Sequence, residues 1–417
     1  MKIARQINSS PRIALLAAFS FALLFVSQSA FAQAKKKKLK DGEMEEFEEV
    51  DPYTKGERES FRKLGYTNYA PFLWHGSELT NHVQESMGGI DILWVETEHF
   101  KIGSTLGRYK VPNDKVEKTK YKEEIARIKE KLGKVKVKWP KKEIDPWLRL
   151  HIYAQRAEDL YSEFAEEFAA DPGGRMKSGP YLGCKNKFLL LICQRKSEFG
   201  RYVRTYHDLD TPYSYRTGWP DDSMLYICNL EVIKEFYVDD SDEKPFDSML
   251  HVRIASNLTA NFMDGYGGKF FYAPQWLTKA AEHYYGRKVD ARWTASAGLK
   301  AGQVTEDDDY EWEERVAKLC KNNFFARTTE MFGWTRGYEM NRRDHMVIWS
   351  KLQYIVEELE GNAGAMVNSM LIPVRGMEVG IKEELLKRQT TALMAHYELA
   401  PGELDENWRK WVKKNYK

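Results

Sequence analysis

The chain has 417 residues, and its 64 lysines and arginines nearly balance its 62 aspartates and glutamates. This balance argues against a dedicated nucleic-acid-binding protein, which carries a clear positive excess. The 12 tryptophans and 23 tyrosines indicate a substantial packed core and exclude disorder throughout the chain. The length suits one large domain or two modest ones.

Residues 1–32 have the pattern of a signal peptide. A basic start precedes an apolar run, residues 13–26, and the pattern ends in a small-x-small cleavage sequence. The basic residues are Lys2, Arg5 and Arg12, and the cleavage sequence is Ala30-Phe31-Ala32. We expect cleavage before Gln33 and an exported protein, periplasmic or extracellular. The apolar run is too short for a comfortable transmembrane helix and no second run follows, so no membrane span is predicted.

Residues 33–85 follow as a charged leader. Residues 35–38 are four lysines, and residues 43–49 are mostly glutamate. Segregated charge with few apolar residues is typical of a mobile segment. We therefore predict that the leader is mobile and that its first part, to about residue 60, is dispensable for folding.

An α+β domain with a small mixed sheet is predicted over residues 86–294. Dense apolar residues that alternate towards their end predict a strand over residues 90–102. Further strands and helices alternate along the chain, which is the order expected of this fold class. They are a helix over 147–169, a strand over 187–193, a helix over 199–206 and a strand over 224–229.

A charged helical insertion is predicted at residues 107–145. Its helix begins at the capping pair Asp114 and Glu117 and ends at Gly133. Apolar residues recur at helical spacing but form only a narrow stripe, which favours a helix on the surface or against a partner.

A helical C-terminal subdomain is predicted over residues 295–417. Glycine or proline separates its apolar segments, and the last helix has apolar residues every four positions. The expected helices cover 345–359, 364–371, 381–396 and 403–412.

The four cysteines leave two alternatives open. Their spacing fits neither a redox motif nor a zinc ribbon. Cys193 and Cys228 each end an apolar run that predicts a buried strand, so a disulfide between them is possible in an oxidising compartment. Buried free thiols are the equal alternative.

Two segments of the chain resemble the zinc site of gluzincin metallopeptidases of the peptidase MA-like family. The segment Leu250-His251-Val252-Arg253-Ile254-Ala255 matches the helix that carries His-Glu-x-x-His, and Pro274-Gln275-Trp276-Leu277-Thr278-Lys279-Ala280 matches Pro-x-Trp-Leu-x-Glu-Gly. Looser matches are Glu96-Thr97-Glu98-His99-Phe100, as an entry strand, and Glu403-Leu404 with Trp408 near the end.

The resemblance implies a degenerate site without zinc ligands or cofactor. Val252 replaces the general base, Ala255 the second histidine and Lys279 the glutamate ligand, so only His251 remains. If the resemblance holds, the helices that bear His251 and Lys279 pack side by side and positions 251, 255 and 279 converge. Glu282 is the expected partner of Lys279 by its spacing.

A rebuilt metal site is the alternative. The candidate ligands near His251 are Glu282 and His283 on the second helix, and His207, Asp208 and Asp210 in a preceding loop.

Three functions follow from these patterns. The first is an exported, catalytically inactive peptidase-like protein that binds a protein or peptide, or assembles with one. Its groove would be lined by Tyr266, Phe270, Phe271, Tyr272, Trp276 and Glu282. The second is an active zinc metallohydrolase with rebuilt ligands, and the third is a structural subunit of the cell envelope. The sequence leaves the oligomeric state open.

Overall fold

The computed structural model describes residues 50–133, 143–168, 179–236, 244–267, 271–293, 311–373 and 381–416. All of them belong to one compact unit, Glu46–Lys417. The predicted signal peptide and the first part of the leader lie outside the described residues. Within the described part, no helix is both long enough and apolar enough to cross a membrane.

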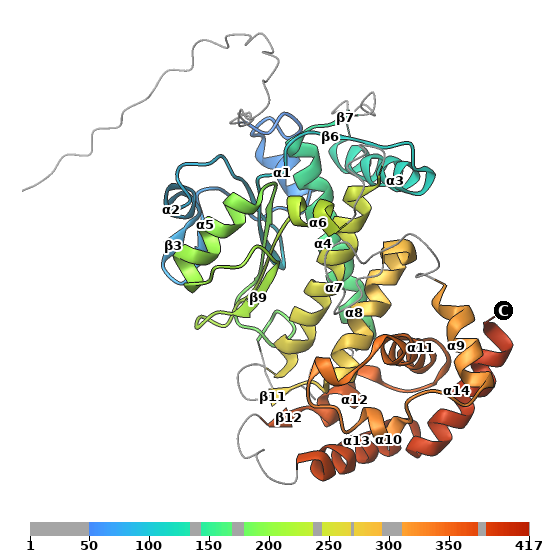
Figure 1. Cartoon of the computed structure of the whole chain (residues 1–417). Helices are drawn as coiled ribbons and strands as arrows, with labels where there is room; N and C mark the ends of the chain where they lie inside the picture. The colour runs from blue at the N-terminus through green and yellow to red at the C-terminus, as the bar shows by residue number, and fades with distance from the viewer. Residues whose placement is uncertain are drawn as a thin grey trace, which may run out of the picture. The chain divides into compact units, whose positions relative to one another are not determined.

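A small mixed sheet of six strands organises the first half of the fold (Figure 1). Its order is β1 (Asn68–Tyr69), β4 (Leu93–Glu96), β5 (Phe100–Ser104), β8 (Phe188–Cys193), β10 (Met224–Asn229) and β9 (Tyr215–Gly218). The three central strands β5, β8 and β10 are parallel, and the strands outside them are antiparallel. The strand predicted over residues 90–102 is instead the hairpin of β4 and β5.

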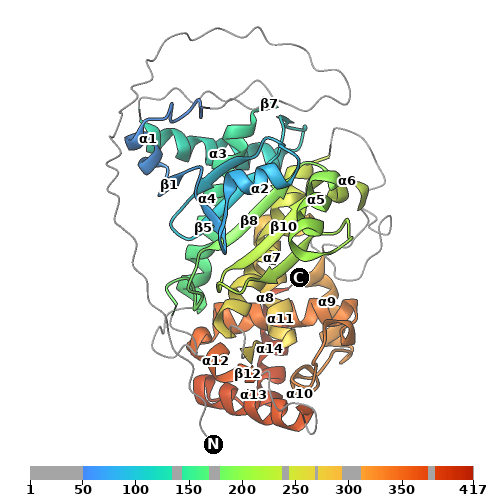
Figure 2. The ribbon, with the colours of Figure 1, turned by 90° about the vertical axis from the view of Figure 1, so that its left-hand side faces the viewer.

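Helices cover both faces of the sheet, as Figure 2 shows, which explains why β8 is apolar at every position. Leu190 and Ile192 face a main core that includes α4 (Pro146–Phe168) and α7 (Phe246–Gly267). Leu189 and Leu191 face a second core with α2 (Thr80–Ser86) and α5 (Lys196–His207). The fold class is therefore α+β, as predicted.

The predicted disulfide between Cys193 and Cys228 is wrong, because both are buried free thiols. In the ladder of β8 and β10, Cys228 lies opposite Ile192 and Cys193 lies opposite Asn229. Successive residues of a strand point to opposite faces, so this offset by one position separates the two thiols. Cys228 accordingly belongs to the main core and Cys193 to the second core.

Residues 50–85 are ordered, contrary to the prediction of a mobile leader. They form α1 (Arg58–Lys63), the hairpin of β2 (Leu73–His75) and β3 (Glu78–Leu79), and α2. Phe61, Tyr66 and Trp74 are buried, and the Trp74 indole donates to the Tyr202 hydroxyl at 2.9 Å. A few large aromatic side chains therefore anchor a segment that is otherwise charged.

A buried relay ties the start of this segment to α4. The Tyr66 hydroxyl lies 2.6 Å from Nδ1 of His151, and Nε2 of His151 lies 3.1 Å from the Asp51 carboxylate. The Thr54 hydroxyl also donates to Asp51, at 2.6 Å. The packed body thus begins at or before residue 51.

The predicted insertion carries the helix α3 (Lys115–Leu132) and the hairpin of β6 (Tyr109–Lys110) and β7 (Glu143–Ile144). The Asp114 side chain caps the helix at the backbone N–H of Glu117, and Gly133 ends it with φ 63°. The helix lies against α4 rather than free on the surface, because Tyr121, Ile125 and Ile128 are buried in a third core.

The second half is helical, and its residues share the main core with the sheet. Its longer helices are α8 (Gln275–Asp290), α9 (Trp312–Lys321), α11 (Arg342–Glu358), α12 (Ala363–Met370), α13 (Ile381–Tyr397) and α14 (Pro401–Asn415). Shorter elements are α6 (Leu230–Phe236), η2 (Ala291–Trp293), α10 (Thr328–Met331), η3 (Gly337–Glu339) and the pair β11 (Phe271–Tyr272) and β12 (Ile372–Pro373).

One buried ion pair lies inside the helical half. The Lys351 ammonium on α11 lies 2.7 Å from the Asp405 carboxylate on α14 and donates to the Ala326 carbonyl at 3.0 Å. Asp405 also accepts from the Thr328 hydroxyl at 2.6 Å. These bonds fasten α14 to α10 and α11.

Candidate functional site

Helices α7 and α8 pack against each other, which confirms the predicted helix pair. A Cβ atom added at Gly286 would lie 2.4 Å from the Ser256 hydroxyl and 3.6 Å from a Val252 methyl group. The absence of a side chain at Gly286 therefore permits this close approach. The end of α8 meets the first half of α7, so the two helices run antiparallel.

His251 lies in the interior, against α4. Its ring is 6.5 Å from that of Tyr153, and in the described part of the chain its Nδ1 has no hydrogen-bond partner. Burial, with the nearby charges of Lys120 and Arg156, holds the pKa of His251 well below its ordinary value. The imidazole is therefore neutral near pH 7.

A buried charge cluster, which we call the Asp247 cluster, lies beside His251. The Asp247 carboxylate accepts from Arg156 at 2.7 Å, from the Tyr153 hydroxyl at 2.8 Å and from Arg149 at 3.3 Å. Arg156 also binds both oxygens of Glu124, at 2.8 and 2.9 Å. The cluster joins α3, α4 and the first turn of α7.

Glu117 extends the Asp247 cluster towards the first turn of α7. It accepts from the Tyr109 hydroxyl at 2.6 Å and from the Ser248 backbone N–H at 3.0 Å. Burial and the charge of Asp247 raise the pKa of Glu117 to about 7. Each carboxylate of the cluster thus accepts at least two hydrogen bonds from groups of the fold, which favours a structural role over a catalytic one.

Lys279 has a different set of neighbours. Its ammonium lies 2.7 Å from the Glu282 carboxylate, which confirms the predicted partner. One turn further on, Nε2 of His283 lies 2.9 Å from Nδ1 of His345 on α11. Burial and the charge of Lys279 lower the pKa of His345 to about 4, so this histidine pair is also neutral near pH 7.

The packing of α7 and α8 does not bring Lys279 to His251. Lys279 lies seven residues before Gly286, which is about 10 Å along a helix. Because the helices are antiparallel, this displacement leads towards the end of α7 and away from His251. The predicted convergence of positions 251, 255 and 279 is therefore not found, and buried Val252 and Ala255 pack as ordinary apolar side chains.

The candidate ligands for a rebuilt site are also apart. Glu282 is bound to Lys279 and His283 to His345. His207 lies in the second core, where its ring contacts those of Tyr215 and Trp219, so the sheet separates it from α7. Asp210 pairs with Arg204, and Asp208 ends α5 with φ 51°.

No set of three or more histidine, cysteine, aspartate or glutamate side chains that could hold a metal ion occurs among the described residues.

The predicted groove residues do not form one exposed set. Trp276 is buried, stacks on Phe332 and donates from Nε1 to Gln389 at 2.7 Å, so it is an interior residue. Phe271 is partly buried in β11 and packs against the main core. Phe270 lies outside the described residues, as do the side chains of Tyr266 and Tyr272.

The structure reveals instead an open strand edge beside α7. Among the residues that the structure describes, β9 is the last strand of the sheet and pairs on one side only, with β10. The Trp219 N–H donates to the Ser223 carbonyl at 2.8 Å, so Trp219 and Ser223 form a hydrogen-bonded pair at the end of the hairpin. In an antiparallel ladder every second pair of residues is hydrogen-bonded. Thr217 and Tyr215 therefore bond to β10, and the main-chain groups of Arg216 and Gly218 point outwards.

A polar stripe on α7 accompanies this edge. Arg253, Asn257, Asn261 and Asp264 share one face of the helix, and all but Asn261 are partly exposed. Arg216 of β9 forms an ion pair with Asp264. In the sequence the only signal of this stripe is a helical recurrence of polar residues in an otherwise apolar helix, and nothing there marks β9 as the outermost strand.

Comparison of the chain with protein-family models, with curated proteins and with solved structures gives no match.

Proposed function

We propose that this chain is an exported, non-catalytic binding protein that holds an extended polypeptide segment along the free edge of β9. The observation that carries the proposal is the outward direction of the Arg216 and Gly218 main-chain groups at the end of the sheet. An extended peptide adds to such an edge through main-chain hydrogen bonds, and side-chain contacts then provide specificity. The polar stripe of α7 supplies those contacts.

The absence of catalysis is part of the proposal. Val252 and Ala255 cannot accept a proton or ligate zinc, and the Lys279 ammonium is paired with Glu282. Export follows from the signal-peptide pattern of residues 1–32.

Two substitutions at Gly218 test the binding mode. The protein, starting at Gln33, is screened against a library of unstructured peptides, and the affinity of the best peptide is measured by calorimetry. Gly218→Pro removes the outward N–H, which edge strands tolerate, and should weaken binding about tenfold, the equivalent of one or two lost hydrogen bonds. Gly218→Ala is the matched control. Like proline it places a Cβ atom near the Met224 sulfur, but it keeps the N–H, so this variant should bind the peptide almost normally.

Two results of the same peptide experiments would contradict the proposal. Equal affinity of the Gly218→Pro variant and the unmodified protein would refute binding at β9. Cleavage of the library peptides, together with about one tightly held zinc per chain by elemental analysis, would establish the metallohydrolase alternative. Thr217→Pro breaks the β9–β10 ladder and serves as the control for loss of the strand itself.

A further inference from the structure

Exposed lysines recur every seven residues along helix α3. Lys115, Lys122 and Lys129 are all exposed, and we call these three residues the lysine row. Seven residues make nearly two helical turns, so the three side chains share one face and lie about 10 Å apart along the axis. Figure 1 shows α3 at the margin of the fold. The row therefore presents three evenly spaced positive charges to solvent.

The fold does not neutralise the lysine row. Among the described residues, no hydrogen bond or ion pair holds the side chain of Lys115, Lys122 or Lys129. Lys118 lies on the same side of the helix and donates to the Asn113 side chain at 2.5 Å. Asparagine carries no charge, so the Lys118 ammonium adds to the positive field of the row.

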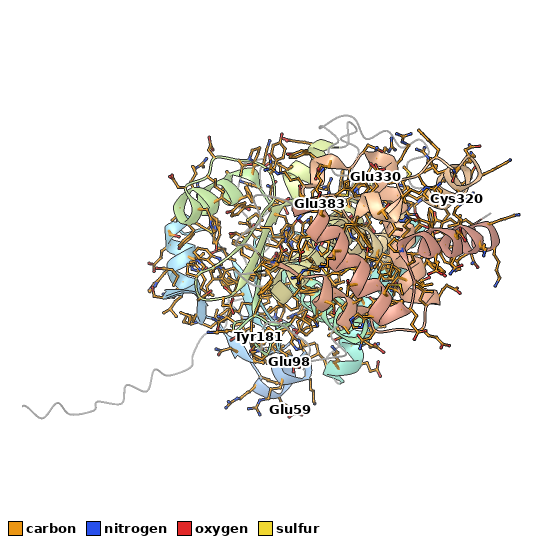
Figure 3. All side chains as sticks on the ribbon, turned by 90° about the horizontal axis from the view of Figure 1, so that it is seen from below. Glu59, Glu98, Tyr181, Cys320, Glu330 and Glu383 are labelled. Carbon is orange, nitrogen blue, oxygen red and sulfur yellow. The ribbon has the colours of Figure 1, made fainter. Side chains whose placement is uncertain are left out.

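The acidic groups around α3 are mostly engaged by other groups of the fold. The pairs are Asp114 with Arg292, Glu117 with Tyr109, Glu124 with Arg156, Asp159 with Arg127 and, on α1, Glu59 with Lys63. Glu59 lies at the edge of the molecule in Figure 3, and exposed Glu143 of β7 lies opposite Lys110 of β6. On α3 itself, Glu123 and Glu130 stay exposed and have no such partner among the described residues.

We propose that the lysine row binds an anionic polysaccharide that carries one carboxylate or sulfate group per disaccharide. Two pyranose units of an extended glycan have about the length that separates successive lysines, about 10 Å. Each ammonium then meets one anion of the chain. Lysine suits this partner, because its compact charge and rotatable donors do not require one fixed orientation of the anion. The proposal goes beyond binding at β9, and only the place where such a glycan is met rests on the proposed export.

The same helix argues against two other anionic partners. Phosphates of one strand of duplex DNA lie about 3.4 Å apart along the axis, so lysines about 10 Å apart leave most of them unmatched. Tyr121 is the one aromatic residue of α3 and it is buried, so the helix offers no ring on which bases of a single strand could stack. The apolar face of α3 is buried in the third core, so it cannot enter a membrane surface.

The test measures binding of a fluorescein-labelled hyaluronan hexasaccharide, which carries three carboxylates. The protein starts at Gln33, and binding is followed by fluorescence anisotropy at low ionic strength, where exposed charges are less screened. Lys115→Gln/Lys122→Gln/Lys129→Gln should weaken binding about tenfold, because three exposed ion pairs together contribute about that much. The lysines at 35–38 and 134–142 remain in every variant, so they cannot cause this difference.

Matched control variants separate the row from charge in general. Lys410→Gln/Lys413→Gln/Lys414→Gln removes the same charge from exposed positions of α14 and should change binding less than about twofold. Lys131→Gln, on the opposite side of α3 from the row, should change it equally little. Glu123→Gln/Glu130→Gln removes repulsion beside the row and should tighten binding.

Two further probes test the spacing and the kind of anion. Trigalacturonate carries its three carboxylates on adjacent sugars, at half the interval, and should bind more weakly than the hyaluronan hexasaccharide. A keratan sulfate hexasaccharide carries sulfate in place of carboxylate at the same interval. The tighter of the two hexasaccharides identifies the anion that the row prefers.

Four results would overturn the proposal. The first is an equal loss of affinity in the row variant and the α14 control, and the second is no measurable binding of either hexasaccharide. The third is tighter binding of trigalacturonate than of both hexasaccharides. The fourth is tighter binding of a single-stranded oligonucleotide of equal charge, or of phosphatidylglycerol vesicles, than of both hexasaccharides. Gly218→Pro should leave glycan binding unchanged, so failure at β9 and failure here are distinguishable, and thermal melting confirms that each variant is folded.

Discussion

Among the described residues, the Asp247 cluster and the buried Lys351–Asp405 pair satisfy their charges in different ways. In the Asp247 cluster, two arginines and a tyrosine surround one carboxylate, and Glu124 pairs with one of the same arginines. In the helical half, a single lysine, Lys351, meets a single carboxylate, Asp405. Both clusters fasten helices that are far apart in the sequence.

The difference between arginine and lysine decides how each cluster responds to pH. Burial alone would raise the pKa of Asp247, but Arg156 and Arg149 lower it to about 2. Burial lowers the pKa of Lys351 to about 8, and Asp405 offsets this effect only in part. Arginine does not lose its proton in proteins, whereas this lysine does so in an accessible range. The arginine–aspartate pairs of the first cluster therefore keep their charges over this range, and the lysine of the second cluster does not.

The largest expected effect is that of Asp247→Asn. The substitution keeps the shape of the side chain but leaves Arg149 buried without a carboxylate. We expect a loss of about 3–5 kcal/mol in the free energy of unfolding, measured by urea denaturation. Neither arginine can discharge, so the loss should persist at pH 9, reduced only by the relief of Glu117, whose pKa burial and the Asp247 charge raise. A loss below about 1 kcal/mol would show that the cluster contributes little to stability.

Asp405→Asn should have a smaller effect that depends on pH. At pH 6 the variant must either bury the Lys351 ammonium without its partner or release its proton, and in both cases we expect a loss of roughly 1–3 kcal/mol. At pH 9 the lysine is neutral and most of this loss disappears. In the unmodified protein the folded pKa lies below the ordinary 10.5, so this group makes stability rise with pH between about 8 and 10.5. If Asp405→Asn loses the same unfolding free energy at pH 6 and pH 9, the contrast between the lysine pair and the arginine cluster is contradicted.

The smallest expected effect concerns Glu117. Its folded pKa of about 7 lies above the ordinary 4.5, so between these values the folded protein binds more protons than the unfolded one. This group therefore lowers stability as pH rises from 4.5 to 7, by about 1–2 kcal/mol after allowance for its coupling to Asp247. Glu117→Gln should flatten the stability profile over this range. If the slope is unchanged in the Glu117→Gln variant, the fall in stability between pH 4.5 and 7 comes from another titrating group.

The elements of the fold were predictable where periodicity is strong and unbroken. The long helix α4, the strands β8 and β10 and the last helix α14 lie within a few residues of their expected bounds, because a continuous apolar stripe or run fixes the period. The ordered segment 50–85 was missed because its burial depends on three large aromatic residues among many charges. The contact of Asp51 with His151 is tertiary and leaves no local pattern.

The candidate site was less predictable, for a related reason. Motif residues locate the helices α7 and α8 correctly, and spacing identifies the pair of Lys279 and Glu282. The axial register of the two helices depends on the close contact at Gly286, which no short motif encodes. Likewise, the free edge of β9 follows from the strand order of the sheet, and strand order is a property of the whole fold.

The last helix also bears on how the chain reaches its folded state. The Trp408 indole and the Tyr416 hydroxyl both donate to the Ser350 hydroxyl, each at 2.9 Å, and the main core contains residues from Phe61 to Tyr416. Contacts between such distant residues form slowly, so we expect the core to close only after the whole chain has been synthesised. Such a delay would suit the proposed export, in which the chain is threaded through a channel unfolded. A chain that ends before Pro401 should accordingly show no fixed near-ultraviolet circular dichroism from its tryptophans.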